Sequence, residues 1–293
     1  LRSAPPPPGS AGIGSISPRT SLAMAPFSRY GQYIPLAAVV FGSLTLLSTL
    51  KLAYDHRHVP AGMWLPFISL CGASPPERHV YAAGFCATAA CIFASALYAR
   101  RHLLSLVEPE HKALAMRSYY AALVAGAGLV GQAVVPLQGD ILDVIGGRAR
   151  VNWQSTLHQS SAGVLFLAGY FHCVSMDLLL ARSRAVPSPL WSRRVKVLLT
   201  VLMLGPFFLA FVPHPATGAG ASIDAMSWGA VGQWCCVVSL LLFFGSYYFE
   251  FSRTPAAAAS SQDPGELKVR RSSGDSTERE AGRRKERGGV EGE

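Results

Sequence analysis

The sequence predicts an all-α, polytopic membrane protein with six transmembrane helices and both termini in the cytosol. Two observations lead to this prediction: six long apolar runs recur along the chain, and Lys and Arg residues concentrate in alternate loops between them. A helix needs about 20 consecutive, mostly apolar residues to cross a bilayer. A soluble core helix of about 10–14 apolar residues would not recur six times at this length.

The expected spans, in chain order, are residues 34–53, 80–99, 119–137, 156–180, 195–212 and 228–249. Each of them is nearly free of charged residues, and the whole chain is 50% hydrophobic and only 15% charged. The third span contains small residues four positions apart: Ala121 and Ala125, Ala122 and Gly126, Ala127 and Gly131. Such pairs let helix backbones approach closely in a membrane, so this span predicts a tight helix interface.

Cytosolic loops of membrane proteins carry an excess of Lys and Arg. Twelve such residues lie before the first span and in the second-to-third and fourth-to-fifth loops: Arg2, Arg19, Arg29, Arg100, Arg101, Lys112, Arg117, Arg182, Arg184, Arg193, Arg194 and Lys196. Only five lie on the opposite side: Lys51, Arg57, Arg78, Arg148 and Arg150. Loops 54–79, 138–155 and 213–227 should therefore face the lumen or exterior. This topology accounts for the net charge of +9, and nucleic acid is not expected as a partner because basic and aromatic residues form no common stripe.

Three regions are expected along the chain. Residues 1–30, which include the run Pro5–Pro8, should be disordered, although Met24 offers an alternative start and a transit peptide is a competing interpretation. Residues 31–252 form the six-helix transmembrane domain. Residues 253–293 carry nine Lys or Arg and eight Asp or Glu, which is typical of a disordered, mixed-charge cytosolic tail.

The sequence gives little support for a metal site, and no cofactor is expected. No CxxC pair and no HExxH spacing is present, and most of the six cysteines fall inside expected spans. His158 and His172 lie on nearly the same face of the fourth span, but they are roughly 21 Å apart along a helix that rises ~1.5 Å per residue. A group of His158, His214 and Asp224 would be the remaining, weak candidate.

The first lumenal loop contains the most distinctive local pattern. Ser74 followed by Glu77 fits a capping box, and Pro75 fits the first position of the helix that forms the second span. Gly72 would provide a tight turn before that helix. The apolar stretch from Pro66 to Ser69 suggests a re-entrant or interface-lying segment.

Several of these residues resemble the motifs of the damage-regulated autophagy modulator (DRAM) family, which includes the Frag and Sfk membrane proteins and the post-GPI-attachment-to-proteins factors. The similar residues of the first loop are Pro66, Phe67, Ile68, Ser69, Gly72, Pro75, Pro76 and Glu77. Further along the chain, Gln138 after the third span, His158 at the head of the fourth, and Gln233-Trp234 in the sixth are similar to family positions. The resemblance covers roughly residues 30–252 and implies six spans.

Two residues depart from the family pattern. Pro136 replaces an asparagine, and Gln233 replaces the glutamate that usually precedes the tryptophan. An amide does not titrate, so Gln233 could replace a hydrogen-bonding acid but not one that transfers protons. The second departure weakens an enzymatic role inferred from the resemblance, and whether the protein is an enzyme stays open.

On the expected topology, Glu77, Gln138, His158, Gln233 and Trp234 all lie near the lumenal interface of the membrane. Because polar groups at the bilayer usually face a bundle interior or cavity, we hypothesise a lumenal polar pocket for a lipid headgroup or glycolipid. The alternative is that each residue only bonds to a neighbouring helix or caps a helix end.

The resemblance implies a non-enzymatic endomembrane protein that acts in lipid organisation or autophagy-related membrane homeostasis. The alternative is a GPI-anchor lipid-remodelling factor of the Golgi or ER, acting as an acyltransferase component with His158 as the base. Membrane lipids are the expected partners, together with membrane or cytosolic proteins. Spans of short to moderate length favour the lysosome, Golgi or ER, with the plasma membrane as the alternative.

Overall fold

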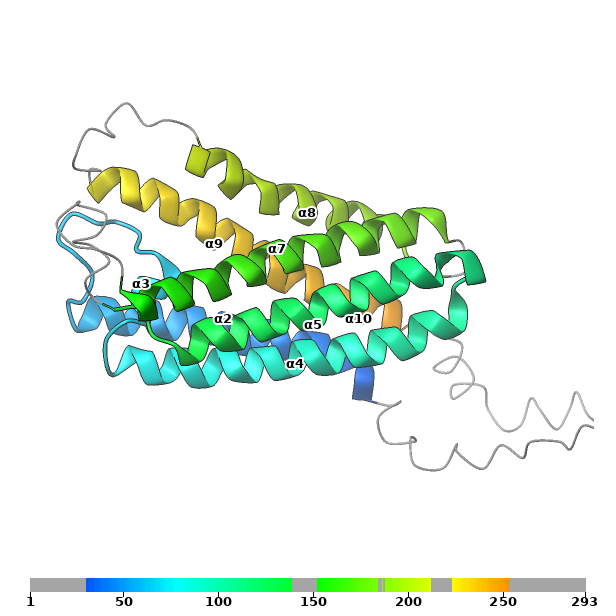
Figure 1. Ribbon diagram of the computed structural model, residues 1–293, viewed down its shortest axis with the longest axis horizontal. Coiled ribbons are helices and arrows are strands. Elements are labelled where there is room, and N and C mark those ends of the chain that lie inside the picture. The colour runs from blue at the N-terminus through cyan, green and yellow to red at the C-terminus, as the bar shows by residue number, and fades with distance from the viewer. Residues whose placement is uncertain (1–29, 139–151, 184–185, 187, 212–222, 253–293) are drawn as a thin grey trace, which may run out of the picture.

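A computed structural model of the chain describes residues 30–138, 152–183, 186, 188–211 and 223–252. Its long helices lie side by side along one axis (Figure 1). They are α2 (Ile34–Asp55), α4 (Glu77–Leu106), α5 (Lys112–Val134), α7 (Trp153–Arg182), α8 (Leu190–Phe211) and α9 (Ile223–Gly245). Short helical turns complete the fold: η2 (Gly31–Tyr33), α3 (Ile68–Cys71), η3 (Pro109–His111) and α10 (Tyr247–Phe251).

The prediction of an all-α membrane protein is confirmed, since the described residues contain helices and no strand. Five segments are long and apolar enough to cross a membrane: Gly31–Asp55, Glu77–Leu106, Pro109–Val134, Trp153–Arg182 and Met226–Phe251. Helix α8 coincides with the expected span 195–212 but is not one of the five. A sixth span therefore stays a prediction.

Each long helix packs against at least one of the others. Helix α5 packs along α7 and α4, while α2 packs along α4 and α9, and α8 lies against α9. The small residues of α5 make the close approaches that were expected of them. A Cβ atom on Gly126 would lie 2.7 Å from the Phe93 ring, and one on Gly128 would lie 2.6 Å from the backbone nitrogen of Leu165 in α7.

The two ends of the bundle differ. The rings of Tyr33 and Tyr248 are 5.8 Å apart, so the first and last described residues lie at the same end, which we call the terminal end. The opposite end, called the loop end, contains residues 56–76, 135–138 and the first turns of α7 and α9 (Figure 1).

Which end of the bundle faces the cytosol stays a prediction. The expected terminal segments lie outside the described residues, except for Tyr30.

The first loop differs from its expected local structure. Helix α4 begins at Glu77, its N-cap is Pro76, and no side chain caps it, so the capping box and the helical position of Pro75 were wrong. The observed N-cap is Pro76 and not Ser74, so Glu77 is the first residue of the helix instead of the third, and its carboxylate binds His58. The apolar stretch enters α3, whose Ile68 is 2% exposed and belongs to the main core.

Candidate functional site

The family-like loop segment is attached to α9 by the two predicted residues of the sixth span. The Gln233 Oε1 atom accepts a hydrogen bond from the Ile68 N–H at 2.8 Å. The Trp234 Nε1–H donates to the carbonyl oxygen of Pro66 at 2.9 Å. Gly229 lies one turn earlier on α9, where a Cβ atom would be 3.3 Å from the Phe67 ring. Residues 66–68 are thus bound to the last long helix through their backbone.

The bond to Ile68 explains why Gln233 can stand where the family usually has glutamate. The donor is a backbone N–H at the start of α3, so its partner must be an oxygen atom. An amide oxygen and a carboxylate oxygen both accept this bond. The contact that the structure shows at this position is a hydrogen bond to the first loop.

Gln138 and His158 join the end of α5 to the start of α7. The Gln138 N–H donates to Ser155 Oγ at 3.2 Å, and the Gln138 side chain binds Gln154. His158 is 2% exposed, and its Nδ1 atom lies 2.7 Å from the carbonyl oxygen of Val135. A carbonyl oxygen only accepts hydrogen bonds, so the proton must sit on Nδ1. The His158 Nε2 atom is buried without a partner among the described residues.

Glu77 forms a third group with the first loop. Its side chain is 1% exposed, and Oε1 lies 2.8 Å from Nδ1 of His58, whose side chain is 35% exposed. The second oxygen, Oε2, is buried and has no partner within the described part of the chain. Nearby, burial raises the pKa of the Cys71 thiol to about 12, with a smaller contribution from the charge of Glu77.

The remaining motif residues have structural roles or are exposed. Gly72 lies against the Tyr81 ring, where a Cβ atom would be 2.3 Å from Cδ2, so its small size serves close approach. Its φ of −108° is open to any residue, so the expected glycine-specific turn is not what it provides. Pro75 and Pro76 are exposed and joined by a cis peptide bond, and Ser69 is half-buried in α3.

A second polar region, which the sequence did not predict, lies at the terminal end. The Lys196 Nζ atom is 2.9 Å from Oε2 of Glu250, and the two side chains are 0% and 1% exposed. Glu250 Oε1 also accepts hydrogen bonds from Ser188 at 2.7 Å and Ser192 at 2.9 Å. Lys196 was counted with the charges of the fourth-to-fifth loop, but it lies inside α8, which begins at Leu190, and its side chain is buried. A lysine inside the expected span 195–212, with a glutamate directly after the expected span 228–249, was the available signal.

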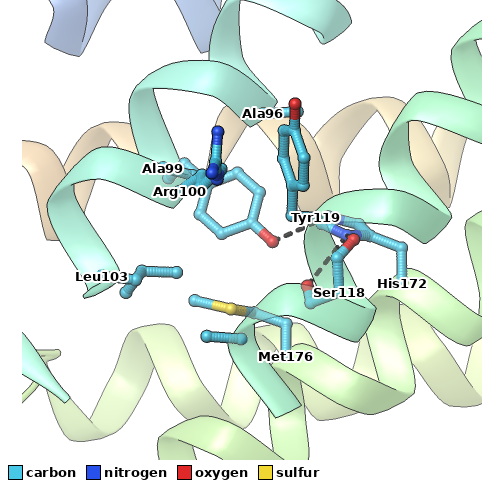
Figure 2. A pocket seen from close by; sticks show the side chains of 10 residues that line it. Ala96, Ala99, Arg100, Leu103, Ser118, Tyr119, His172 and Met176 are labelled. Carbon is cyan, nitrogen blue, oxygen red and sulfur yellow. Dashed lines mark hydrogen bonds between the residues drawn. The ribbon is translucent and has the colours of Figure 1, made fainter. Parts of the chain in front are cut away.

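Further polar side chains continue this region. His172 Nδ1 donates to the Ser118 carbonyl at 2.8 Å, so its Nε2 accepts from the Tyr247 hydroxyl at 2.8 Å. Figure 2 shows these groups beside a small cavity, about the size of one water molecule, with Arg100 and Tyr119 on its wall. In α7, Asp177 accepts a hydrogen bond from Thr200 at 2.7 Å. Both nitrogens of His172 are satisfied by protein groups, which is typical of a structural histidine.

The structure tests for a metal site only among the residues that it describes. Across the ranges that the structure describes, no group of three or more His, Cys, Asp or Glu side chains could hold a metal ion. His214 and the side chain of Asp224 lie outside those ranges.

The predicted pocket residues divide into three hydrogen-bonded groups at the loop end. Within the described part of the chain, these groups contain two buried acceptor atoms without partners, Glu77 Oε2 and His158 Nε2.

Comparisons with known proteins give a consistent result. The family model described as "Frag1/DRAM/Sfk1/Cwh43P N-terminal domain" matches residues 30–254. Transmembrane protein 150A of Homo sapiens is 25% identical over 221 residues, which are 69% of this chain and 68% of that protein. Transmembrane protein 150A of Mus musculus is 25% identical over 199 residues, 64% of this chain and 62% of its own length. No solved structure matches the chain.

Proposed function

Because the chain belongs to the Frag1/DRAM/Sfk1/Cwh43P family of membrane proteins, we propose that it binds a lipid headgroup at its loop end. In this proposal it is a non-enzymatic protein of the endomembrane system that organises membrane lipids, including those used in autophagy. Lipids are its main partners, and membrane or cytosolic proteins are further partners.

The observation that supports this function most directly is the pair of buried acceptors, Glu77 Oε2 and His158 Nε2. Leaving a buried polar atom without a hydrogen bond costs about 1–3 kcal/mol. Both residues lie at the loop end, where helices meet the membrane interface on the expected topology. Lipid headgroups are polar groups that lie at that depth.

The roles of the neighbouring residues favour binding over catalysis. Gln233 Oε1 and Trp234 Nε1 are each bonded to the backbone of residues 66–68. Gln233 also cannot exchange a proton. These contacts stabilise the loop beside Glu77, which is the role of a scaffold.

Lipidomics of the detergent-purified full chain tests lipid binding. We expect the wild type to retain a particular lipid class, and His158→Ala and Gln233→Ala to lose it. Gly163→Ala is the matched control, because a Cβ atom there would meet nothing within 4 Å. If all variants and the wild type carry only bulk lipid, the loop end is purely structural and the proposal fails.

A second candidate function is GPI-anchor lipid remodelling in the Golgi or ER, with this chain as an acyltransferase component. The observation that favours it is the tautomer of His158, because an unprotonated Nε2 can accept the proton of an attacking lipid hydroxyl. Deletion of the gene separates the two functions. Loss of GPI-anchored proteins from the cell surface would support remodelling, while an intact GPI profile with altered autophagy or lipid asymmetry would support lipid organisation.

A further inference from the structure

We propose that the loop end binds the headgroup phosphate of an anionic lipid through a patch of exposed arginine and histidine side chains, and that acid strengthens this binding. The patch, which we call the cationic patch, consists of His56, Arg57, His58, Arg78 and His79, all of them exposed. This inference rests on the proposed lipid-binding function and narrows its ligand to lipids with a negatively charged headgroup.

One hydrogen bond joins the two segments that form the cationic patch. His58 Nδ1 lies 2.8 Å from Glu77 Oε1, and the helices that flank this loop, α2 and α4, pack along each other. Arg57 directly precedes His58 in the chain, and Arg78 directly follows Glu77. The His56 ring is stacked on the His58 ring at a centroid distance of 5.8 Å. The two segments therefore form one surface at the loop end.

The cationic patch lies at the depth of lipid headgroups. The apolar segment Gly31–Asp55 ends directly before it, and the apolar segment Glu77–Leu106 begins beside it. At the same end, Trp64 and Trp228 are about half exposed and form an edge-to-face pair with ring centroids 5.3 Å apart. Exposed tryptophans are typical of the membrane interface. The patch thus lies near the phosphates of one leaflet, whichever side of the membrane that leaflet faces.

The charges around the cationic patch favour an anion. Between residues 51 and 79 the only acidic residues are Asp55 and Glu77. Each of these carboxylates is already paired, and that of Glu77 is also buried. Among the residues that the structure describes, no carboxylate pairs with the guanidinium group of Arg57 or Arg78. A guanidinium group binds phosphate oxygens through two parallel hydrogen bonds, which suits both arginines to a lipid phosphate.

The backbone at Arg57 gives a second indication of a binding surface. Its φ is 57°, and it is the only non-glycine residue with positive φ in the described part of the chain. This left-handed region favours glycine, and a residue with a long side chain adopts it at an energetic cost. Residues held in such conformations are concentrated at functional sites. An anion-binding surface explains why a cation occupies a position that glycine would adopt more easily.

The histidines should make anion binding depend on pH. An exposed histidine gains a positive charge as the pH falls from about 7.5 to about 5.5, whereas an arginine and a lipid phosphodiester keep their charges. Only the Glu77 carboxylate is bonded to a histidine of the patch, so the charge gained by the other two histidines is available to a ligand. The charged and titratable groups around these histidines are Lys51, Asp55, Arg57, Cys71, Glu77 and Arg78.

The test uses the full chain in detergent with an equimolar mixture of dioleoyl phosphatidylglycerol and dioleoyl phosphatidylcholine, and mass spectrometry of the lipid that co-purifies at pH values of about 7.5 and about 5.5. Phosphatidylglycerol keeps its negative charge at both pH values, so a change in retention comes from the protein. One added positive charge near an anionic lipid strengthens the attraction about fivefold. We expect the wild type to prefer phosphatidylglycerol at both pH values, and this preference to rise at least about fivefold in acid.

Two variants each remove one permanent charge of the cationic patch. We expect Arg57→Gly and Arg78→Gln to lower the preference for phosphatidylglycerol about fivefold at both pH values. Arg57→Gly also places glycine at a φ that glycine favours, so its thermal midpoint should stay near that of the wild type or exceed it. A lower preference in this variant therefore reports lost binding and not lost folding.

A further pair of variants tests the role of the histidines. The double variant His56→Gln, His79→Gln should keep the preference at neutral pH and lose its rise in acid. His58 stays unchanged because it bonds to Glu77. His111→Gln, the same substitution at the terminal end, is the matched control and should keep the rise. Cations at the terminal end, such as Arg117, keep their charge over this range and contribute equally at both pH values.

The outcomes separate this inference from the function on which it rests. Equal retention of both lipids by the wild type overturns the anionic-lipid inference and leaves lipid binding intact. An unchanged preference in both arginine variants, or an acid-induced rise that the double histidine variant keeps, overturns it too. If the wild type retains neither test lipid nor any lipid class of its own, the proposed function fails as well.

Discussion

At the scale of single residues, the contacts between the first loop and α9 use backbone atoms of the loop and side chains of the helix. Gln233 and Trp234 would make the same bonds with many different side chains at positions 66 and 68, provided that the loop backbone keeps its path. These bonds therefore depend on the conformation of the loop backbone, which the prolines of the loop restrict.

Substitution of Gln233 distinguishes an acceptor from a titrating group. Gln233→Glu keeps an oxygen for the Ile68 N–H, so we expect the thermal midpoint in detergent to change little. Gln233→Leu leaves that N–H unpaired and should destabilise the fold by about 1–3 kcal/mol. Equal midpoints for the two variants would contradict the hydrogen-bonding role.

The reactivity of Cys71 should report its burial. Maleimides react with the thiolate, and a pKa raised to about 12 keeps this thiol protonated from pH 7 to 9. We expect its labelling in the folded protein to stay slow over that range and to become fast only after denaturation. Ala61→Cys, at an exposed position of the same loop, is the control and should label faster as pH rises. Rapid labelling of Cys71 at pH 8, located by mass spectrometry, would contradict the buried position.

At the scale of elements, the contact between α5 and α7 depends on the absence of a side chain. Gly128→Ala would place Cβ 2.6 Å from the Leu165 nitrogen and 2.8 Å from the Ser161 carbonyl oxygen. Both are backbone atoms, so the helices must separate, and we expect a loss of roughly 1–3 kcal/mol in thermal unfolding. Gly163→Ala on α7 meets nothing within 4 Å and should be neutral or slightly stabilising.

The ion pair between α8 and α10 should be costly to break and tolerable to replace. Lys196→Met leaves Glu250 charged and buried, and we expect a loss of about 3–5 kcal/mol. The double variant Lys196→Met, Glu250→Met replaces both charges with apolar side chains of similar length and should recover most of that loss in thermal unfolding. A double variant as unstable as the single one would show that the surrounding serines need the carboxylate.

At the scale of the whole molecule, the two ends of the bundle should face opposite sides of the membrane. Ala61 is exposed at the loop end and Glu110 is exposed at the terminal end. With a membrane-impermeant maleimide in selectively permeabilised cells, we expect Glu110→Cys to label from the cytosol and Ala61→Cys only when the lumenal or exterior side is reached. The reverse pattern would overturn the predicted orientation while leaving the fold unchanged.

The sequence predicted the helices well because hydropathy alone determines which segments can cross a bilayer. Expected spans 80–99 and 228–249 fall within α4 and within the combined range of α9 and α10. The small residues of α5 were also informative, because close packing in a membrane requires them. Hydropathy and the spacing of small residues can both be read from a single segment of the sequence.

Contacts between segments were less predictable. The partner of Lys196 lies 54 residues away in the chain, and sequence charge alone does not tell which side of a helix faces the bundle. Glu77 was assigned to a capping box from its spacing after Ser74, but the helix begins at Glu77 itself, and its carboxylate binds His58, 19 residues away. The sequence thus identified the polar residues of the loop end without identifying their partners.

The bonds from α9 to the first loop also have a consequence for biosynthesis. Pro66 and Ile68 leave the ribosome long before Trp234 and Gln233, which follow them by 168 and 165 residues. Until α9 is inserted, the carbonyl of Pro66 and the N–H of Ile68 lack their partners Trp234 and Gln233. A nascent or truncated chain that lacks α9 therefore also lacks both of the bonds that attach its first loop to the bundle.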